Sequence, residues 1–230
     1  MTLANFDWIS LVYGVAALFI AVELVRNRRD FVDTLFTADD RALAVRVGFL
    51  WLTPFGVLIH EVAHWLLAQS VGASNVRMDY RFYWGFVSYR GLLPAEASFA
   101  IAAAGPLASA LLAVAALVAA LRAPQPFRTV LGVFGITTAG FVLVIYPIMS
   151  FIGPVGDFRI IYADRTPSLG AAAGVFHMAL LAMSAWLYYR RGPMTPVRPS
   201  WGWQPAAPAP NPLPLETPPD QPTRPTQDPP

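Results

Sequence analysis

Residues 47–69 read VGFLWLTPFGVLIHEVAHWLLAQ and indicate a membrane protein with a metal site. It has about the length that an α-helix needs to cross the apolar core of a bilayer. Its only ionisable residues are His60, Glu61 and His64. Residues four apart share a face of a helix, so both imidazoles can reach one metal ion while Glu61 lies beside them as a base. Because ionisable side chains are costly at membrane depth, this cluster indicates a functional site.

The composition of the whole chain agrees with a membrane protein. Of its 230 residues, 56% are hydrophobic and only 13% are charged, whereas globular domains are about 25% charged. There are no cysteines, which excludes disulfides, cysteine zinc sites and thiol nucleophiles. The basic residues are arginines scattered among hydrophobic segments, so we expect no nucleic acid as a partner.

Apolar segments recur along the chain and predict an all-α polytopic membrane protein with about five transmembrane helices. One membrane-embedded domain is expected over residues 1–192. From residue 193 to residue 230 proline recurs every few positions, which predicts a disordered proline-rich tail. The five predicted spans are residues 8–25, 47–69, 95–121, 129–151 and 171–189.

Between the second and third spans the periodicity changes from helical to alternating. Apolar and polar residues alternate over residues 76–90 around Gly85, a pattern that predicts a β-hairpin. Two interpretations stay open. The hairpin either anchors the protein at the membrane interface with its aromatic residues, or it offers a strand edge to an extended substrate.

A catalytic zinc commonly has three protein ligands, so a third ligand should accompany His60 and His64. The second and fourth spans leave the membrane on the same side, which brings Asp157, just after the fourth span, to the layer of the histidines. Asp157 also follows Gly156, where the backbone can turn back toward the helices. We therefore favour Asp157. The competing candidates are Asp79, Glu96, Asp164 and His177. For His177 alone we favour a structural role, as a helix-packing histidine hydrogen-bonded to a neighbour.

Three motifs in this order resemble the site-2 protease family of intramembrane zinc metalloproteases. They are the HEVAH stretch of residues 60–64 within one span, Ala102-x-x-Gly105-Pro106 in the next, and Gly156-Asp157 after the one following. The resemblance covers residues 47–189. It departs from the family where Phe158 follows the aspartate in place of the usual glycine, and no asparagine is evident near the Gly-Pro pair.

The resemblance implies an activity and a site. It implies a zinc endopeptidase that cuts membrane-anchored protein substrates in or near their transmembrane segments, either in regulated intramembrane proteolysis or in removal of signal-peptide remnants. Zn²⁺ would be held by His60, His64 and Asp157, with Glu61 as the catalytic residue. The protein would be a multi-pass integral protein of a prokaryotic cell membrane, with the lipid bilayer as its surroundings.

Two alternatives to this function follow from the residues. A metalloprotease with its site in a soluble dome would need a downstream glutamate ligand, and only Glu96 and Glu216 follow the motif. The second alternative is a catalytically inactive membrane scaffold or metal-binding protein that retains the protease fold. The presence of Glu61 argues against it, because a metal carrier needs the histidines but no base. Membrane orientation stays open, because the arginine distribution and the family resemblance favour opposite faces.

Overall fold

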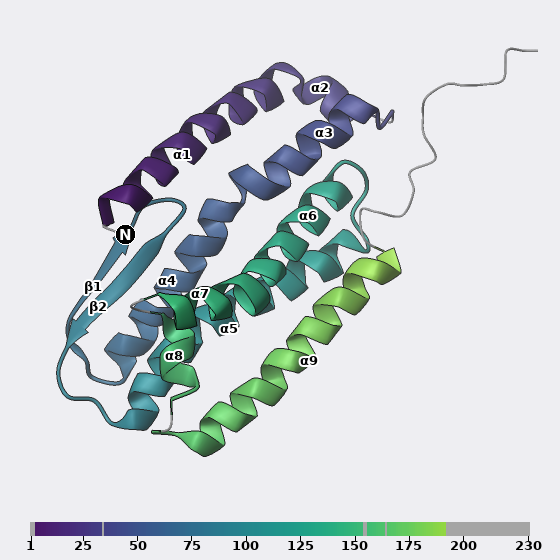
Figure 1. Ribbon diagram of the computed structural model, residues 1–230. Coiled ribbons are helices and arrows are strands. Elements are labelled where there is room, and N and C mark those ends of the chain that lie inside the picture. Colours follow the sequence, from purple (N-terminus) through teal and green to yellow (C-terminus); the bar gives the residue numbers. More distant parts are fainter. Residues whose placement is uncertain (1–2, 34, 154–155, 164, 192–230) are drawn as a thin grey trace, which may run out of the picture. The chain divides into compact units, whose positions relative to one another are not determined.

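The computed structural model describes residues 3–33, 35–153, 156–163 and 165–191, with the side chains of residues 3–6, 9 and 191 left aside. The tail predicted over residues 193–230 lies outside these. The described residues form helices and one small sheet (Figure 1). In chain order the elements are α1 (Leu3–Arg26), α2 (Arg28–Phe31), α3 (Ala38–Arg46), the π-helical turn η1 (Val47–Trp51), α4 (Thr53–Ser70), β1 (Ser74–Tyr80), β2 (Gly85–Arg90), α5 (Ala95–Ala120), α6 (Phe127–Gly140), the π-helical turn η2 (Phe141–Ile145), α7 (Tyr146–Ile152), α8 (Asp157–Ile161) and α9 (Pro167–Arg191).

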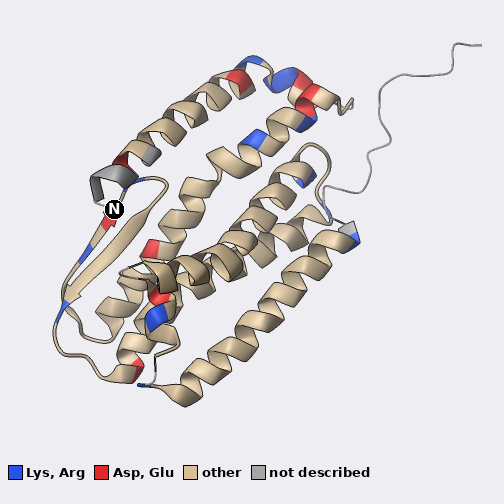
Figure 2. Cartoon of the chain, in the orientation of Figure 1, with Lys and Arg blue, Asp and Glu red and all other residues tan. Residues whose placement is uncertain are grey.

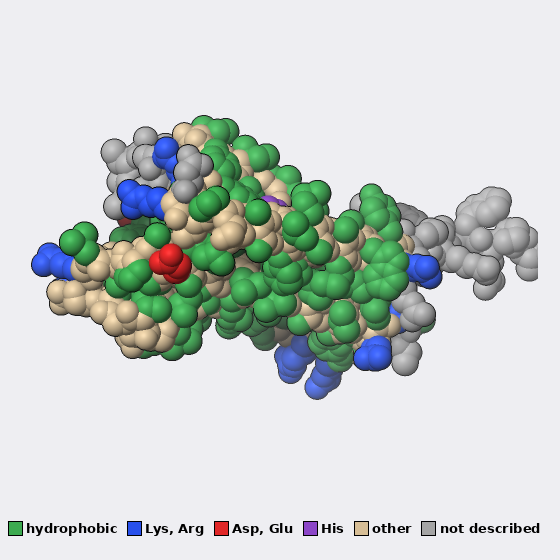
Figure 3. All heavy atoms as spheres, turned by 90° about the horizontal axis from the view of Figure 1, so that it is seen from below, with side chains coloured by type: hydrophobic (Ala, Val, Ile, Leu, Met, Phe, Trp, Pro, Cys, Tyr) green, Lys and Arg blue, Asp and Glu red, His purple; other side chains and the backbone are tan. Residues whose placement is uncertain are grey.

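Within the described residues, four helical stretches are long and apolar enough to cross a membrane. They are Ala38–Ser70, Ala95–Ala120, Phe127–Ile152 and Pro167–Arg190. Charged residues gather at α2 and α3 and at the ends of the long helices, while α9 carries none until its C-terminal end (Figure 2). Hydrophobic side chains cover much of the face seen in Figure 3, and many large hydrophobic residues of the described chain are exposed. These features indicate a membrane protein, as predicted; a fifth crossing by α1 stays a prediction.

The second predicted span is longer than its apolar stretch. A capping box starts the helix at Thr37: the Thr37 side chain accepts a hydrogen bond from the Asp40 N–H at 3.2 Å, and the Asp40 carboxylate accepts one from the Thr37 N–H at 2.9 Å. Such a box satisfies two backbone donors of the first turn. The helix then continues through η1 into α4. At the end of α3, just before η1, Arg46 makes a bidentate ion pair with Glu23 of α1, at 2.6 and 2.7 Å.

Prolines interrupt two of the long helices, one close to the HEVAH motif and the other close to Asp157. Pro54 follows η1, and Pro147 follows η2. Proline has no N–H and its ring clashes with the carbonyl four residues earlier, so a helix must widen or bend there. A π-helical turn is one way to widen it, and such turns are frequent at functional sites.

The carbonyls that these prolines leave without a helical donor find partners on other elements. The carbonyl four residues before Pro54 is that of Leu50, and the Tyr83 hydroxyl of the hairpin donates to it at 2.6 Å. Buried backbone carbonyls need such a partner, above all in a membrane. The tip of the hairpin therefore supplies a hydrogen bond that the helix itself lacks.

The hairpin is antiparallel, with Met78 opposite Val87 and Tyr80 opposite Gly85. This confirms the strand pair that the alternating pattern predicts. It packs on α4, where the Tyr80 hydroxyl donates to the Pro54 carbonyl at 2.8 Å. Its tip also reaches α1, since the Ser10 hydroxyl donates to the carbonyl of residue 81 at 2.7 Å. The hairpin thus lies between α1 and α4 (Figure 1).

Helix α5 is in contact with α4, α6, α8 and α9. Small residues dominate its buried positions, among them Ala102, Gly105, Ser109 and Ala113. Small side chains let membrane helices approach closely. As a result, one face of α5 lies against the histidines of α4 while its other faces pack on α6 and α9.

We predict that Tyr83→Phe lowers the free energy of unfolding by about 1 kcal/mol, because the Leu50 carbonyl then loses its donor. Tyr89→Phe is the matched control on the same hairpin, since the Tyr89 hydroxyl makes no hydrogen bond to any described residue. Both can be measured by denaturant titration in detergent micelles. Equal losses for the two variants would contradict the role given to Tyr83.

Candidate metal centre

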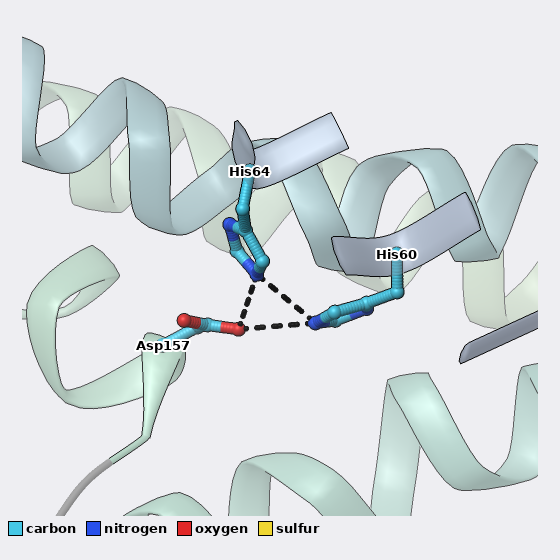
Figure 4. Close-up of side chains that lie close together, drawn as sticks. All are labelled: His60, His64 and Asp157. Carbon is cyan, nitrogen blue, oxygen red and sulfur yellow. Dashed lines mark hydrogen bonds and ion pairs between the residues drawn. The ribbon is translucent and has the colours of Figure 1, made fainter. Parts of the chain in front are cut away.

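His60 and His64 lie one turn apart in α4 and point to the same side of it (Figure 4). Their Nε2 atoms are 3.0 Å apart. His64 is buried and His60 nearly so. The spacing of the motif accounts for this geometry, because residues four apart on a helix lie one above the other.

Asp157 is the first residue of α8 and brings its carboxylate to the two imidazoles (Figure 4). Its Oδ2 atom lies 3.3 Å from the Nε2 atom of His60 and 3.1 Å from that of His64. The backbone reaches this position because Gly156 packs directly against Ser150, where a side chain would collide. The structure therefore brings together the three residues that the sequence predicts as metal ligands.

The distances among these three atoms fit a zinc ion. Zinc binds imidazole nitrogen and carboxylate oxygen at about 2.0–2.2 Å in tetrahedral geometry, which separates neighbouring ligand atoms by about 3.3–3.5 Å. The observed separations of 3.0, 3.1 and 3.3 Å are close to that range. Two imidazoles and one carboxylate also form a ligand set known from catalytic zinc sites, which keep a further position open.

Gly105 of α5 leaves the space in which such an ion would fit. A Cβ atom built on Gly105 would collide with the Nε2 atom of His64 and lie 2.6 Å from the Nε2 atom of His60. Any larger residue would thus occupy the point at which the ligand atoms converge. The Gly-Pro pair singled out in the sequence belongs to the site for this reason.

The hydrogen bonds of the two Nδ1 atoms hold the histidine rings in place and, for His64, determine the tautomer. His64 Nδ1 lies 2.6 Å from the carbonyl oxygen of Ile101, and since a carbonyl only accepts, Nδ1 carries the proton. His60 Nδ1 lies 3.0 Å from the Ser109 hydroxyl. In neutral His64 the Nε2 lone pair therefore points at the other two ligand atoms. Lone pairs and a carboxylate this close repel one another, so the arrangement favours a cation between them.

Tyr146 holds the third ligand. Its hydroxyl donates to Asp157 Oδ2 at 2.8 Å, and its ring meets that of His60 edge-on at 5.7 Å. This hydrogen bond favours the ionised form of the Asp157 carboxylate. A carboxylate kept ionised is ready to bind a metal.

Sequence reasoning did not identify Tyr146, Ser109 or the Ile101 carbonyl as parts of the site. Ser109 offered a usable signal, since it lies one turn after Gly105 on the same face of α5. For Tyr146 the signal was a polar aromatic residue beside Pro147 within an apolar span. A backbone carbonyl leaves no signal in the sequence.

Glu61 is buried beside the histidines, and its Oε2 atom has no hydrogen-bond partner among the described residues. Strand β2 covers it. A Cβ atom on Gly85 would lie 2.7 Å from Glu61 Cγ and 2.9 Å from the Asp79 carbonyl oxygen. Glycine thus lets the hairpin backbone approach the carboxylate of the motif closely.

The competing candidates for third ligand that lie among the described residues do not join the site. His177 bonds to Tyr162 and to a backbone carbonyl instead, which confirms it as a helix-packing histidine. Within the described part of the chain, Asp79 and Glu96 are not part of the cluster that could hold a metal. Asp164 lies outside the described residues.

Comparison with known protein families, with curated proteins and with solved structures finds no match to this chain. The likeness to site-2 proteases thus stays a resemblance carried by three motifs.

We predict that Gly105→Ala lowers zinc affinity at least tenfold, because the added methyl group occupies the point between the imidazoles. Alanine is a better helix former than glycine, so the helix itself should not weaken. Gly140→Ala is the control, since a Cβ there meets nothing within 4 Å. Chelator competition on the purified protein measures the affinity, and equal affinity in the two variants would contradict the metal centre described here.

Proposed function

We propose that this protein is an intramembrane zinc endopeptidase that hydrolyses peptide bonds in or near the transmembrane segment of membrane-anchored protein substrates. The observation that carries the proposal is the meeting of His60, His64 and Asp157 at 3.0–3.3 Å beside the buried Glu61. Two imidazoles and a carboxylate can hold a catalytic zinc ion, and an adjacent glutamate can serve as the base for hydrolysis.

His60, His64 and Asp157 would hold the ion. When bound, zinc lowers the pKa of a water molecule toward neutrality and polarises a peptide carbonyl. Glu61 is the general base: it accepts the proton of the attacking water and passes it to the leaving amine. Tyr146 and Ser109 keep the ligands in place through Asp157 and His60.

The same proposal includes a multi-pass membrane protein in which α1 forms a fifth crossing. Helix α1 has 24 residues, which is long enough to cross a bilayer core of about 30 Å. Large apolar side chains on its surface are exposed, among them Leu11, Leu18 and Phe19. Such exposure is expected where lipid, rather than water, surrounds the helix.

We further propose that the hairpin holds the substrate. A transmembrane helix hides its peptide groups in internal hydrogen bonds, so a substrate must unwind locally before it can be cleaved. A strand edge can bind an unwound segment through backbone hydrogen bonds. The support is the position of β2, whose Gly85 lies directly against Glu61.

We predict that Glu61→Gln lowers the rate of substrate cleavage by about 10²–10⁴-fold while zinc remains bound, because glutamine cannot accept the proton. Asp157→Ala should lose both cleavage and most of the zinc, because it removes a ligand. The measurements are co-expression with single-span membrane substrates and metal analysis of the purified proteins.

These two variants separate the proposal from its alternative. If Glu61→Gln binds zinc and cleaves as well as the wild type, the general-base mechanism is wrong. If the wild type binds zinc but cleaves none of a broad panel of single-span substrates, a metal-binding scaffold becomes the better description. A well-folded wild type that holds no stoichiometric zinc would contradict the metal centre itself.

We predict that Gly85→Ala slows cleavage at least tenfold without a change in zinc content, because the methyl group pushes strand β2 away from Glu61. Ser88→Ala, at an exposed position of the same strand, is the control and should cleave normally. Equal cleavage rates in the two variants would show that the fit of the hairpin over Glu61 does not matter.

A further inference from the structure

His177 is a half-buried histidine that takes no direct part in the metal centre. Its Nε2 atom lies 2.7 Å from the Leu143 carbonyl oxygen, and its Nδ1 atom lies 3.0 Å from the Tyr162 hydroxyl. Because a carbonyl only accepts, Nε2 carries the proton and Nδ1 accepts the hydroxyl proton of Tyr162. Both nitrogens of a neutral ring are therefore used, and the ring is held in one orientation.

The acceptor of His177 is the carbonyl that Pro147 leaves without its usual donor. Leu143 precedes Pro147 by four residues, so a helical N–H would normally bond to its oxygen. Proline has no N–H, and a buried carbonyl without a donor is costly in a membrane helix. The His177 side chain, from α9, replaces the missing backbone donor and ties α9 to η2.

The bend that this hydrogen bond stabilises carries the residue that holds the third metal ligand. Tyr146 directly precedes Pro147, and its hydroxyl donates to Asp157 Oδ2 at 2.8 Å. The rings of Tyr146 and His177 both pack on Phe158, at 5.7 and 5.5 Å, and Phe158 follows the ligand in sequence. Two routes thus connect His177 to Asp157: a hydrogen bond through the bend at Pro147, and ring packing through Phe158.

We propose that His177 is a positioning residue for the metal centre and acts through the first route. Its N–H fixes the Leu143 carbonyl, which fixes the bend at Pro147, which places the Tyr146 hydroxyl on Asp157. The inference rests on the metal centre of the proposed function and is independent of whether the protein cleaves peptides. Besides packing α9 against η2, His177 then supports a metal ligand that it does not touch.

Two substitutions at His177 distinguish the two routes. His177→Phe keeps a ring against Phe158 but loses the donor, whereas His177→Gln keeps an N–H donor near the position of Nε2 but loses the ring. We expect His177→Phe to lower zinc affinity by about tenfold, as is common when a group behind a ligand is removed, and His177→Gln to stay within about threefold of the wild type. Affinity is measured by chelator competition on purified full-length protein.

Cobalt substitution gives a readout that a general loss of stability would not move. The visible absorption of Co²⁺ reports the geometry and ligands of its site. We expect the spectrum of His177→Phe to differ from that of the wild type and to match that of Tyr146→Phe, because both disturb the same hydrogen bond to Asp157. His177→Gln should retain the wild-type spectrum.

A double-mutant cycle with Pro147→Ala tests the bend itself. Alanine restores an N–H at position 147 that can bond to the Leu143 carbonyl, so His177 should matter less in that background. We expect His177→Phe to lower zinc affinity by less than about threefold when Pro147→Ala is present. An equal effect in both backgrounds would overturn the proposed route.

The outcomes separate this inference from the proposed function. If the wild type binds zinc and His177→Phe binds it equally well with an unchanged cobalt spectrum, the positioning role is wrong and the metal centre stands. If His177→Gln is impaired while His177→Phe is not, ring packing on Phe158 is the route and the inference is also wrong. If the wild type binds neither zinc nor cobalt, both proposals fail together.

Discussion

Three electron-rich atoms meet in an apolar interior, and much of the surrounding structure holds them together. Two imidazole nitrogens and one carboxylate oxygen lie 3.0–3.3 Å apart among helices that are long and apolar enough to cross a membrane. Such atoms repel one another unless a positive charge lies between them, and burial strengthens that repulsion. The glycine at position 105, the hydrogen bonds behind each ligand and the close packing of α4, α5 and α8 all maintain this arrangement.

Prolines near the site link it to elements that contribute no ligand. Pro54 and Pro147 each remove a helical hydrogen bond, and the freed carbonyls of Leu50 and Leu143 accept from side chains of the hairpin and of α9. In water such carbonyls could bond to solvent, but a membrane offers no such partner. The bends near the motif and near the third ligand therefore depend on side chains that are distant in the sequence.

Helix α5 serves two purposes at once. Ile101, Gly105 and Ser109 share the face that meets the histidines, each in a different way: a carbonyl that accepts from His64, a space for an ion, and a hydroxyl against His60. Other faces carry Ala110 and Ala113, which pack with residues of η2 and α9. Small residues make this possible, because α5 can then lie close to several helices.

Four long apolar helices, the hairpin and the histidine pair could be predicted from the sequence alone. The helices follow from the length of continuous apolar runs, and the hairpin and the histidine pair from local periods of 2 and about 3.6 residues. The sequence also favoured Asp157, because successive spans alternate in direction and so assign a side of the membrane to each loop. The partners of these groups became known from the tertiary structure. Tyr146 donates to that carboxylate, Ser109 and the Ile101 carbonyl are hydrogen-bonded to the histidines, and His177 bonds to Leu143. These contacts join residues from 11 to 49 positions apart. They depend on how distant segments pack and partly on backbone carbonyls, which every residue has, so no local sequence pattern predicts them.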